Sequence, residues 1–303
     1  MNKRAEMSAE TSVGAAVPTG SDEDDEILLI LAEQLGQMVV SGLVPGYRAL
    51  SILPILEKLA GVEETVVRDK AVESMNNVIP LLVGDGGDSV KGKEEEEARQ
   101  TCVRTAPGLL LAMVKRMAGA DWFTAKVSSC AVIPCVYQFF NTMKSNVVVA
   151  TSDYDMGLED GGGVTVEAVK SELRNLYRHL AEDDTPMVRR GAGKNLGRYA
   201  EAVAKLPYGK KGGNSGPIAK EYIIPGGKDE TNIKKTVSQD LKNKVVEDVI
   251  PIYHSLARDE QDSVRLLAIS NSGSIGCALG IDGNLTSKFV LQIIKDHSGD
   301  LSW

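Results

Sequence analysis

Residues 181–197 read "AEDDTPMVRRGAGKNLG", and this stretch decides the fold because the chain contains close echoes of it. The echoes are "GVEETVVRDKAVESM" at residues 61–75 and "ARDEQDSVRLLAIS" at residues 257–270. Each joins a short acidic stretch to a Val-Arg pair, and an apolar pattern of helical spacing follows. A local pattern that returns at a distance is typical of a repeat protein.

Four stretches share one internal spacing when the residue before a basic residue is taken as an anchor. The anchors are Val67, Ala125, Val188 and Val264. Eight residues before them stand Leu59, Met117, Leu180 and Leu256, each followed by alanine. Eight residues after the first three stand Met75, Ile133 and Leu196, with Ser272 as the exception after the fourth. Spacing shared by four stretches indicates a structural repeat.

Each unit reads as two helices joined by a turn. Residues 47–60 place Leu50, Leu53, Leu56 and Leu59 on one helical face, and a second amphipathic pattern begins near residue 65. In the unit that contains residues 181–197, Thr185 is predicted to cap the second helix and Pro186 to occupy its first position. Asp262 or Ser263 is predicted to do the same before Val264. The sequence therefore predicts an all-α solenoid of stacked helix pairs.

Proline, aspartate eight residues later and Val-Arg five residues after that is the HEAT-repeat pattern. Pro251, Asp259, Val264 and Arg265 match it in full. The unit at 45–80 has Val62 in place of the aspartate, and the unit around Ala125 lacks both proline and aspartate. The stretches "LAEQLG", "LEKLAGVEETVVRDKAVES", "GADWFT", "AEDDTPMVRR" and "DEQDSVRLLA" resemble the scaffold (A, 65-kDa regulatory) subunit of type 2A serine/threonine protein phosphatase. The resemblance covers residues 22–82, 105–143, 165–206 and 240–303.

The domain organisation follows from the intervals between units. Residues 1–21 are predicted to be a disordered, low-complexity N-terminus, and residues 22–303 a solenoid of about six units with the first and last incomplete. Three Gly-rich, charged insertions near 83–103, 144–164 and 207–239 are predicted to be surface loops on the edge opposite the within-unit turns. Set against the resembling family, the chain is expected to be an N-terminal portion, either a fragment or a natural truncation.

Composition and charge argue against several classes of function. The chain has 303 residues and a formal net charge of −8, which argues against general binding to nucleic acid or anionic membranes. No apolar stretch approaches the length needed to span a bilayer. The four cysteines lack metal-ligand spacing, so a reducing interior is expected. The predicted location is cytoplasmic, with the nucleus as a second compartment.

No catalytic, cofactor or metal site is expected. His179, His254 and His297 have no nucleophile or acid placed with them and are predicted to be structural or at the surface. Gly87–Lys93 resembles a phosphate-binding loop, but Glu94 stands where Ser or Thr is needed. Asp153 and Asp155 have calcium-loop spacing without the closing glutamate, so that motif is rejected.

The within-unit turns are the candidate binding surface, which we call the turn ridge. Its predicted partner-binding residues are Glu63, Glu64, Asp121, Trp122, Phe123, Asp184, Thr185, Pro186, Glu260, Gln261, Asp262 and Trp303. Acids there also suit helix starts, but large aromatic side chains in short turns favour an interface. A ladder of ion pairs between units is predicted from Arg68, Asp183, Arg189, Asp259 and Arg265.

The resemblance implies a non-enzymatic scaffold whose turn ridge docks a regulatory (B-type) subunit. It also implies that the catalytic subunit is held by the C-terminal half of the family's scaffold, which this chain is expected to lack. The main alternative is another HEAT adaptor, for transport or complex assembly, with no phosphatase link. A weaker alternative is a nucleotide-dependent enzyme using the Gly87–Lys93 loop.

Overall fold

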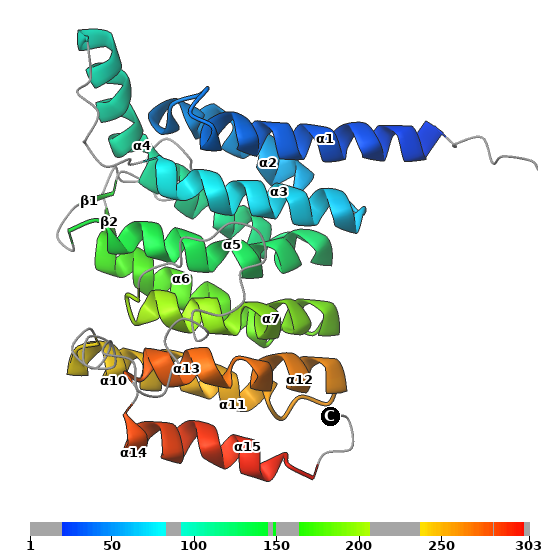
Figure 1. Ribbon diagram of the computed structural model, residues 1–303, viewed down its shortest axis with the longest axis vertical. Coiled ribbons are helices and arrows are strands. Elements are labelled where there is room, and N and C mark those ends of the chain that lie inside the picture. Colours follow the sequence, from blue (N-terminus) through cyan, green and yellow to red (C-terminus); the bar gives the residue numbers. More distant parts are fainter. Residues whose placement is uncertain are drawn as a thin grey trace, which may run out of the picture.

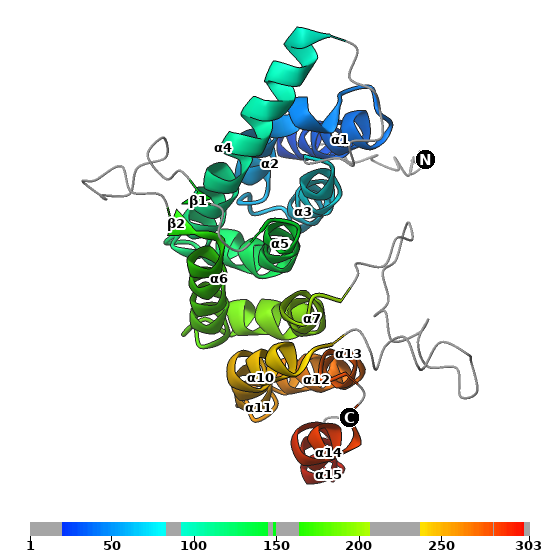
Figure 2. The ribbon, with the colours of Figure 1, turned by 90° about the vertical axis from the view of Figure 1, so that its left-hand side faces the viewer.

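The computed structural model describes residues 20–82, 92–144, 148–149, 164–206, 237–280 and 282–299. Their helices form two stacked layers, seen edge-on in Figure 2. The first layer contains η1 (Gly46–Ser51), α2 (Leu53–Leu59), α4 (Lys93–Ala118), α6 (Val166–Ala181), α10 (Gln239–Asp248) and α11 (Ile250–Leu256). The second contains α1 (Gly20–Val40), α3 (Thr65–Val78), η2 (Ile79–Leu81), α5 (Phe123–Asn141), α7 (Pro186–Val203), α12 (Asp262–Ser270) and α13 (Ser272–Ala278).

The layers repeat along the chain, which confirms the predicted α-solenoid (Figure 1). Helices α1, α3, α5, α7 and α12 contact one another in sequence order, and each of the last four also contacts the first helix of its own unit. A further helical segment closes the described part of the array: α14 (Gly283–Thr286), the π-helical turn η3 (Ser287–Leu291) and α15 (Gln292–Asp296).

The shared spacing corresponds to burial between the two layers. Val67, Val188 and Val264 are buried, whereas Ala125 is half-buried. The positions eight residues earlier are all buried, namely Leu59, Met117, Leu180 and Leu256. The apolar positions eight residues later are buried as well, namely Met75, Ile133 and Leu196. The shared spacing in the sequence therefore marks equivalent buried positions in successive units.

Two first helices are broken, and one of the breaks falls within residues 47–60, where one continuous helix was predicted. The break falls at Ile52 between η1 and α2, and at Val249 between α10 and α11. In both cases proline is the second residue after the break, at Pro54 and Pro251. Proline has no backbone N–H and its ring clashes with the preceding turn, so it fits a helix start better than a helix interior. The HEAT proline thus begins a new helical segment.

The insertions are not wholly loops. Lys93–Val103, assigned to the first insertion, belongs to α4, whose first turn carries Glu94, Glu95 and Glu96. Acidic residues stabilise the positive end of a helix, which the loop assignment overlooked. The second insertion contains β1 (Val148–Val149), which pairs antiparallel with β2 (Val164–Thr165) at the end of the insertion. Residues 1–19, 83–91, 145–147, 150–163, 207–236, 281 and 300–303 lie outside the described residues, and so do Gly87, Asp153, Asp155 and Trp303.

Candidate docking ridge and the ladder behind it

The within-unit turns lie along one edge of the solenoid, on the right-hand side of Figure 1. Each described turn ends where a second helix begins, at Thr65, Phe123, Pro186 and Asp262. These four residues stand two places before the four anchors. The repeat therefore aligns the described members of the predicted ridge on one edge, and Trp303 lies outside the described residues.

Trp122 is the most prominent apolar residue of the turn ridge. Its side chain is 58% exposed, so it does not fill a gap between units. It stands directly before α5, and its ring lies 5.4 Å from the ring of Phe123. Phe123 is half-buried and packs against the hydrophobic core. Phe123 thus anchors the aromatic pair to the core, while Trp122 faces solvent.

Two further apolar side chains accompany Trp122 and were not singled out from the sequence. Val66 is 56% exposed and Met187 is 47% exposed. Both stand directly before an anchor valine, so the repeat spacing itself could have identified them. Exposed acidic residues surround this apolar row: Glu63, Glu64, Asp121, Asp184 and Glu260. The ridge thus combines apolar and negatively charged side chains.

The predicted helix caps are partly wrong. Thr185 precedes α7, and Pro186 takes its first position as predicted, but the Thr185 side chain makes no capping hydrogen bond. Instead, the Thr185 backbone N–H donates to Asp183 Oδ1 at 2.9 Å. Asp262 is the first residue of α12 rather than its cap. The Gln261 backbone N–H donates to Asp259 Oδ1 at 2.9 Å, so the aspartate two residues earlier orders each turn.

The three predicted ladder arginines share a role within their own units. Each donates through Nη1 to two backbone carbonyls of the turn that precedes its helix. Arg68 contacts Val62 O and Glu63 O at 3.1 and 3.0 Å. Arg189 contacts Asp183 O and Asp184 O at 3.0 and 3.1 Å. Arg265 contacts Asp259 O and Glu260 O at 3.0 and 3.3 Å. The Val-Arg arginine therefore fixes its own turn.

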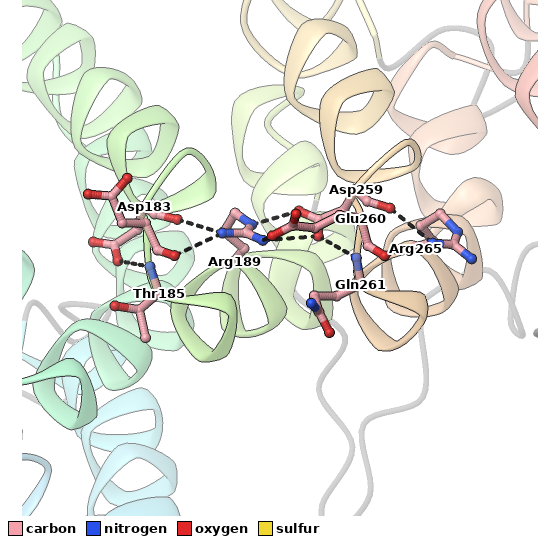
Figure 3. A network of polar contacts seen from close by, with 8 residues as sticks. Asp183, Thr185, Arg189, Asp259, Glu260, Gln261 and Arg265 are labelled. Carbon is pink, nitrogen blue, oxygen red and sulfur yellow. Dashed lines mark hydrogen bonds and ion pairs between the residues drawn. The ribbon is translucent and has the colours of Figure 1, made fainter.

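Ladder ion pairs, in which the cation after one anchor pairs with an acid of the next turn, occur at two junctions among the described residues (Figure 3 shows the second). Arg189 Nε lies 2.7 Å from Asp259 Oδ2, and its Nη2 lies 3.1 Å from Glu260 Oε1. One unit earlier, Lys126 Nζ lies 3.0 Å from Asp183 Oδ2. Lys126 was not assigned to the ladder, although it follows the anchor Ala125 as the arginines follow theirs. A cation after the anchor thus pairs with the aspartate of the next turn.

These contacts shift the pKa values of the ladder groups. Burial alone would raise the pKa of Asp259, but the Arg189 hydrogen bond and the Gln261 backbone N–H hold it below its ordinary value. The pKa of Asp183 is lowered in the same way, by the Thr185 backbone and Lys126 against burial. The hydrogen bond to Asp259 raises the pKa of Arg189. Both carboxylates are therefore held ionised.

Arg68 does not extend the ladder, contrary to the prediction. Its described hydrogen bonds go to its own turn and to Thr65 Oγ1, and its buried Nε has no partner. The reason is that Ala120 occupies the position where the next turn would present an aspartate.

Other contacts hold this first junction. The Thr124 and Ser128 hydroxyls donate to Gly61 O and Ala60 O at 2.7 and 2.6 Å. Arg116 also pairs with Glu57 through two hydrogen bonds of 2.9 and 2.7 Å. Hydroxyl groups and a peripheral ion pair thus stand in for the ladder where the aspartate is missing.

The described residues show no arrangement for metal chemistry. Among them, no group of three or more His, Cys, Asp or Glu side chains could hold a metal ion. All four cysteines are buried and unpaired, and burial raises the pKa of their thiols. His254 Nε2 contacts Phe289 O at 3.0 Å, and His297 Nδ1 contacts Ile293 O at 2.9 Å. In the same ranges, no helix combines the length and apolarity that crossing a bilayer requires.

The chain is similar to known regulatory subunits of protein phosphatases. No protein-family model matches the chain. It is 29% identical over 284 residues to the A-type regulatory subunit of protein phosphatase PP2A from Schizosaccharomyces pombe, covering 93% of the chain and 34% of that protein. It is 36% identical over 185 residues to the alpha isoform of the 65 kDa A-type regulatory subunit of serine/threonine-protein phosphatase 2A from Arabidopsis thaliana, covering 60% of the chain and 24% of that protein.

The resemblance to the 65 kDa regulatory subunit of phosphatase 2A is confirmed. The beta isoform of this subunit from Homo sapiens is 36% identical over 182 residues, covering 60% of the chain and 23% of that protein. The match to the Schizosaccharomyces pombe protein extends along nearly the whole chain, so the repeat array and not one motif carries the similarity. The chain spans about a third of the length of the Schizosaccharomyces pombe protein and about a quarter of the other two.

Proposed function

We propose that the chain is a non-catalytic scaffold of a serine/threonine protein phosphatase that docks a regulatory subunit on the turn ridge. The relatives described above are all named as A-type regulatory subunits of a phosphatase, which supports the phosphatase link over another kind of HEAT adaptor. The proposed location of the site rests on Trp122. Its side chain is 58% exposed in the turn, and its ring contacts that of Phe123.

The chemistry of the ridge defines what a partner must offer. Exposed Trp is the residue type most often found as an interface hot spot, because it buries a large apolar area when a partner covers it. Val66 and Met187 extend the apolar surface to the neighbouring units. The acidic residues around them favour a partner with basic side chains, which would speed association and set its orientation. A regulatory subunit with an apolar patch rimmed by Lys and Arg fits these requirements.

Binding of the purified chain to a regulatory subunit, measured by calorimetry, tests the proposal. Sub-micromolar binding that Trp122→Ala weakens would support it, and full affinity in the variant would place the site elsewhere. Binding of the isolated catalytic subunit is the comparison, and we propose that it is much weaker. The relatives extend well beyond the matched residues, and the resemblance implies that a later part of the scaffold holds the catalytic subunit. We also propose a cytoplasmic location, with the nucleus as a second compartment.

A further inference from the structure

A polar cavity of about 260 Å³ lies on the edge of the solenoid opposite the turn ridge. Its walls come from the ends of α5 and α7 and from the beginnings of α6 and α10. Three lysines from three different helical segments line it, namely Lys170, Lys205 and Lys244. The cavity shares no residue with the ridge, so an inference from it stands independently of the proposed docking function.

Lys170 is the unusual member of this set. Its side chain is only 3% exposed, yet it lines the cavity. In the part of the chain that the structure describes, its ammonium group has no carboxylate or carbonyl partner. Its one described contact is with the face of the Tyr137 ring, 5.8 Å from Nζ. The ammonium group therefore reaches the cavity from a largely buried side chain without a described hydrogen-bond acceptor, and an anion in the cavity would supply one.

Lys205 brings a second positive charge at the expense of backbone strain. It follows α7 with a φ of 54°, the only non-glycine residue with positive φ in the described ranges. The Lys205 and Leu206 N–H groups donate to Ala202 O and Glu201 O, at 3.1 and 2.9 Å, as in a helix end that normally carries glycine at this position. Lysine here is strained where glycine would not be, which points to a use for its side chain.

The cavity lining holds more positive than negative charge, with three lysines against the carboxylates of Glu167 and Asp240. Glu167 already pairs with Lys244 at 2.7 Å and with Arg174 at 3.4 Å. Asp240 lines the cavity as well, but it is exposed in the first turn of α10. Burial, together with the charge of Lys205, lowers the pKa of Lys170 to about 8. The charge of Glu167 partly offsets this effect, but within the described residues no carboxylate forms an ion pair with Lys170 or Lys205.

We propose that this cavity binds a phosphate group, free or as a monoester, between Lys170 and Lys205. The cavity volume admits a small anion, and the first turn of α10 adds the positive end of a helix dipole, where the Leu241 N–H already donates to Ser238 Oγ. The bound dianion would neutralise both ammonium groups at once. Inorganic phosphate and a phosphorylated side chain present the same group, and the test below distinguishes them.

Calorimetric titration of the full chain with inorganic phosphate, at fixed ionic strength, tests the proposal. Lys170→Met should weaken binding at least roughly tenfold. Lys205→Gly should weaken it similarly while the melting temperature stays equal or rises, because glycine relieves the strained φ. Lys194→Met changes an exposed lysine on α7, the helix that Lys205 follows; it is the matched control and should bind like wild type. Lys205→Gly decides the matter if Lys170→Met fails to fold.

A second readout separates the site from diffuse charge attraction. Nuclear magnetic resonance of the Lys170 side chain should show its pKa rising when phosphate is added, because the anion favours the ammonium form. An O-phosphoserine peptide that binds more tightly than inorganic phosphate would identify a phosphorylated side chain as the source, and the reverse order would identify the free ion. Equal affinity in wild type and Lys205→Gly, or a Lys170 pKa unmoved by phosphate, would overturn the proposal.

Discussion

Arg189 and Asp259 form a two-point ion pair across the junction between neighbouring units, with Nε–Oδ2 at 2.7 Å and Nη2–Oδ1 at 3.2 Å (Figure 3). The same guanidinium donates to two carbonyls of its own turn. Asp259 also accepts a hydrogen bond from the Gln261 backbone N–H of its own turn. One arginine therefore links the shape of its own turn to the position of the next unit.

Replacing Arg189 should weaken this junction. Arg189→Lys keeps a positive charge but loses the planar two-point geometry, so we expect a loss of about 1.5–3 kcal/mol in the free energy of unfolding. Urea unfolding measures it, and a double-mutant cycle with Asp259→Asn separates the pair from other losses. The exposed neighbour Arg190, changed to Lys, is the control. Equal unfolding midpoints for Arg189→Lys and Arg190→Lys would contradict a structural role for the ion pair.

Acid should weaken the ladder ion pairs of Asp183 and Asp259 before the units unfold. Asp183 and Asp259 have folded-state pKa values below the ordinary 3.8. Their contribution is therefore complete above that value and disappears as the pH falls through the lower, folded-state pKa. Melting curves from pH 7 down to about pH 3 should show the wild type losing stability faster than an Asp183→Asn, Asp259→Asn double variant. Parallel acid limbs for the two proteins would show that these carboxylates are not responsible.

A ladder ion pair should form at the first junction if an aspartate is introduced there. Ala120 occupies the place of Asp183 and Asp259 in its unit, and the Nε of Arg68 is buried without a partner. Ala120→Asp should supply an acceptor and raise the free energy of unfolding by about 0.5–1.5 kcal/mol. The same substitution in an Arg68→Met background should give no gain. A gain that persists without Arg68 would mean that the new carboxylate acts on something else.

Trp122 offers the test of the turn ridge. Trp122→Ala should weaken regulatory-subunit binding by about 2 kcal/mol or more, roughly thirtyfold, because a partner would bury the exposed ring. The melting temperature should change little, since a side chain that is 58% exposed contributes little to folding. Leu43→Ala removes a side chain that is 72% exposed outside the ridge, and it should leave binding unchanged. Unchanged affinity and melting in Trp122→Ala would leave Trp122 as incidental surface.

Much of this architecture can be predicted from local pattern. The anchors Val67, Val188 and Val264 that the repeat spacing identified are buried, and Pro186 begins its helix as predicted. These features depend on which residues a helix buries and on what a helix end tolerates, and both are determined within a few residues of chain. The spacing also aligns the turns on one edge, which is why Trp122 could be identified as a ridge residue before its exposure was known.

Which of the predicted contacts between units form was decided only by the tertiary structure. The sequence placed Arg68 and Arg189 in equivalent positions, yet only Arg189 has an ion pair across its junction, because its partner depends on what the next turn presents. Lys170 and Lys205 are separated along the chain and meet because the beginning of α6 and the end of α7 lie at the same edge of the stack. Periodicity determines which face of a helix is buried, whereas the pairing of side chains depends on how neighbouring helices pack in three dimensions.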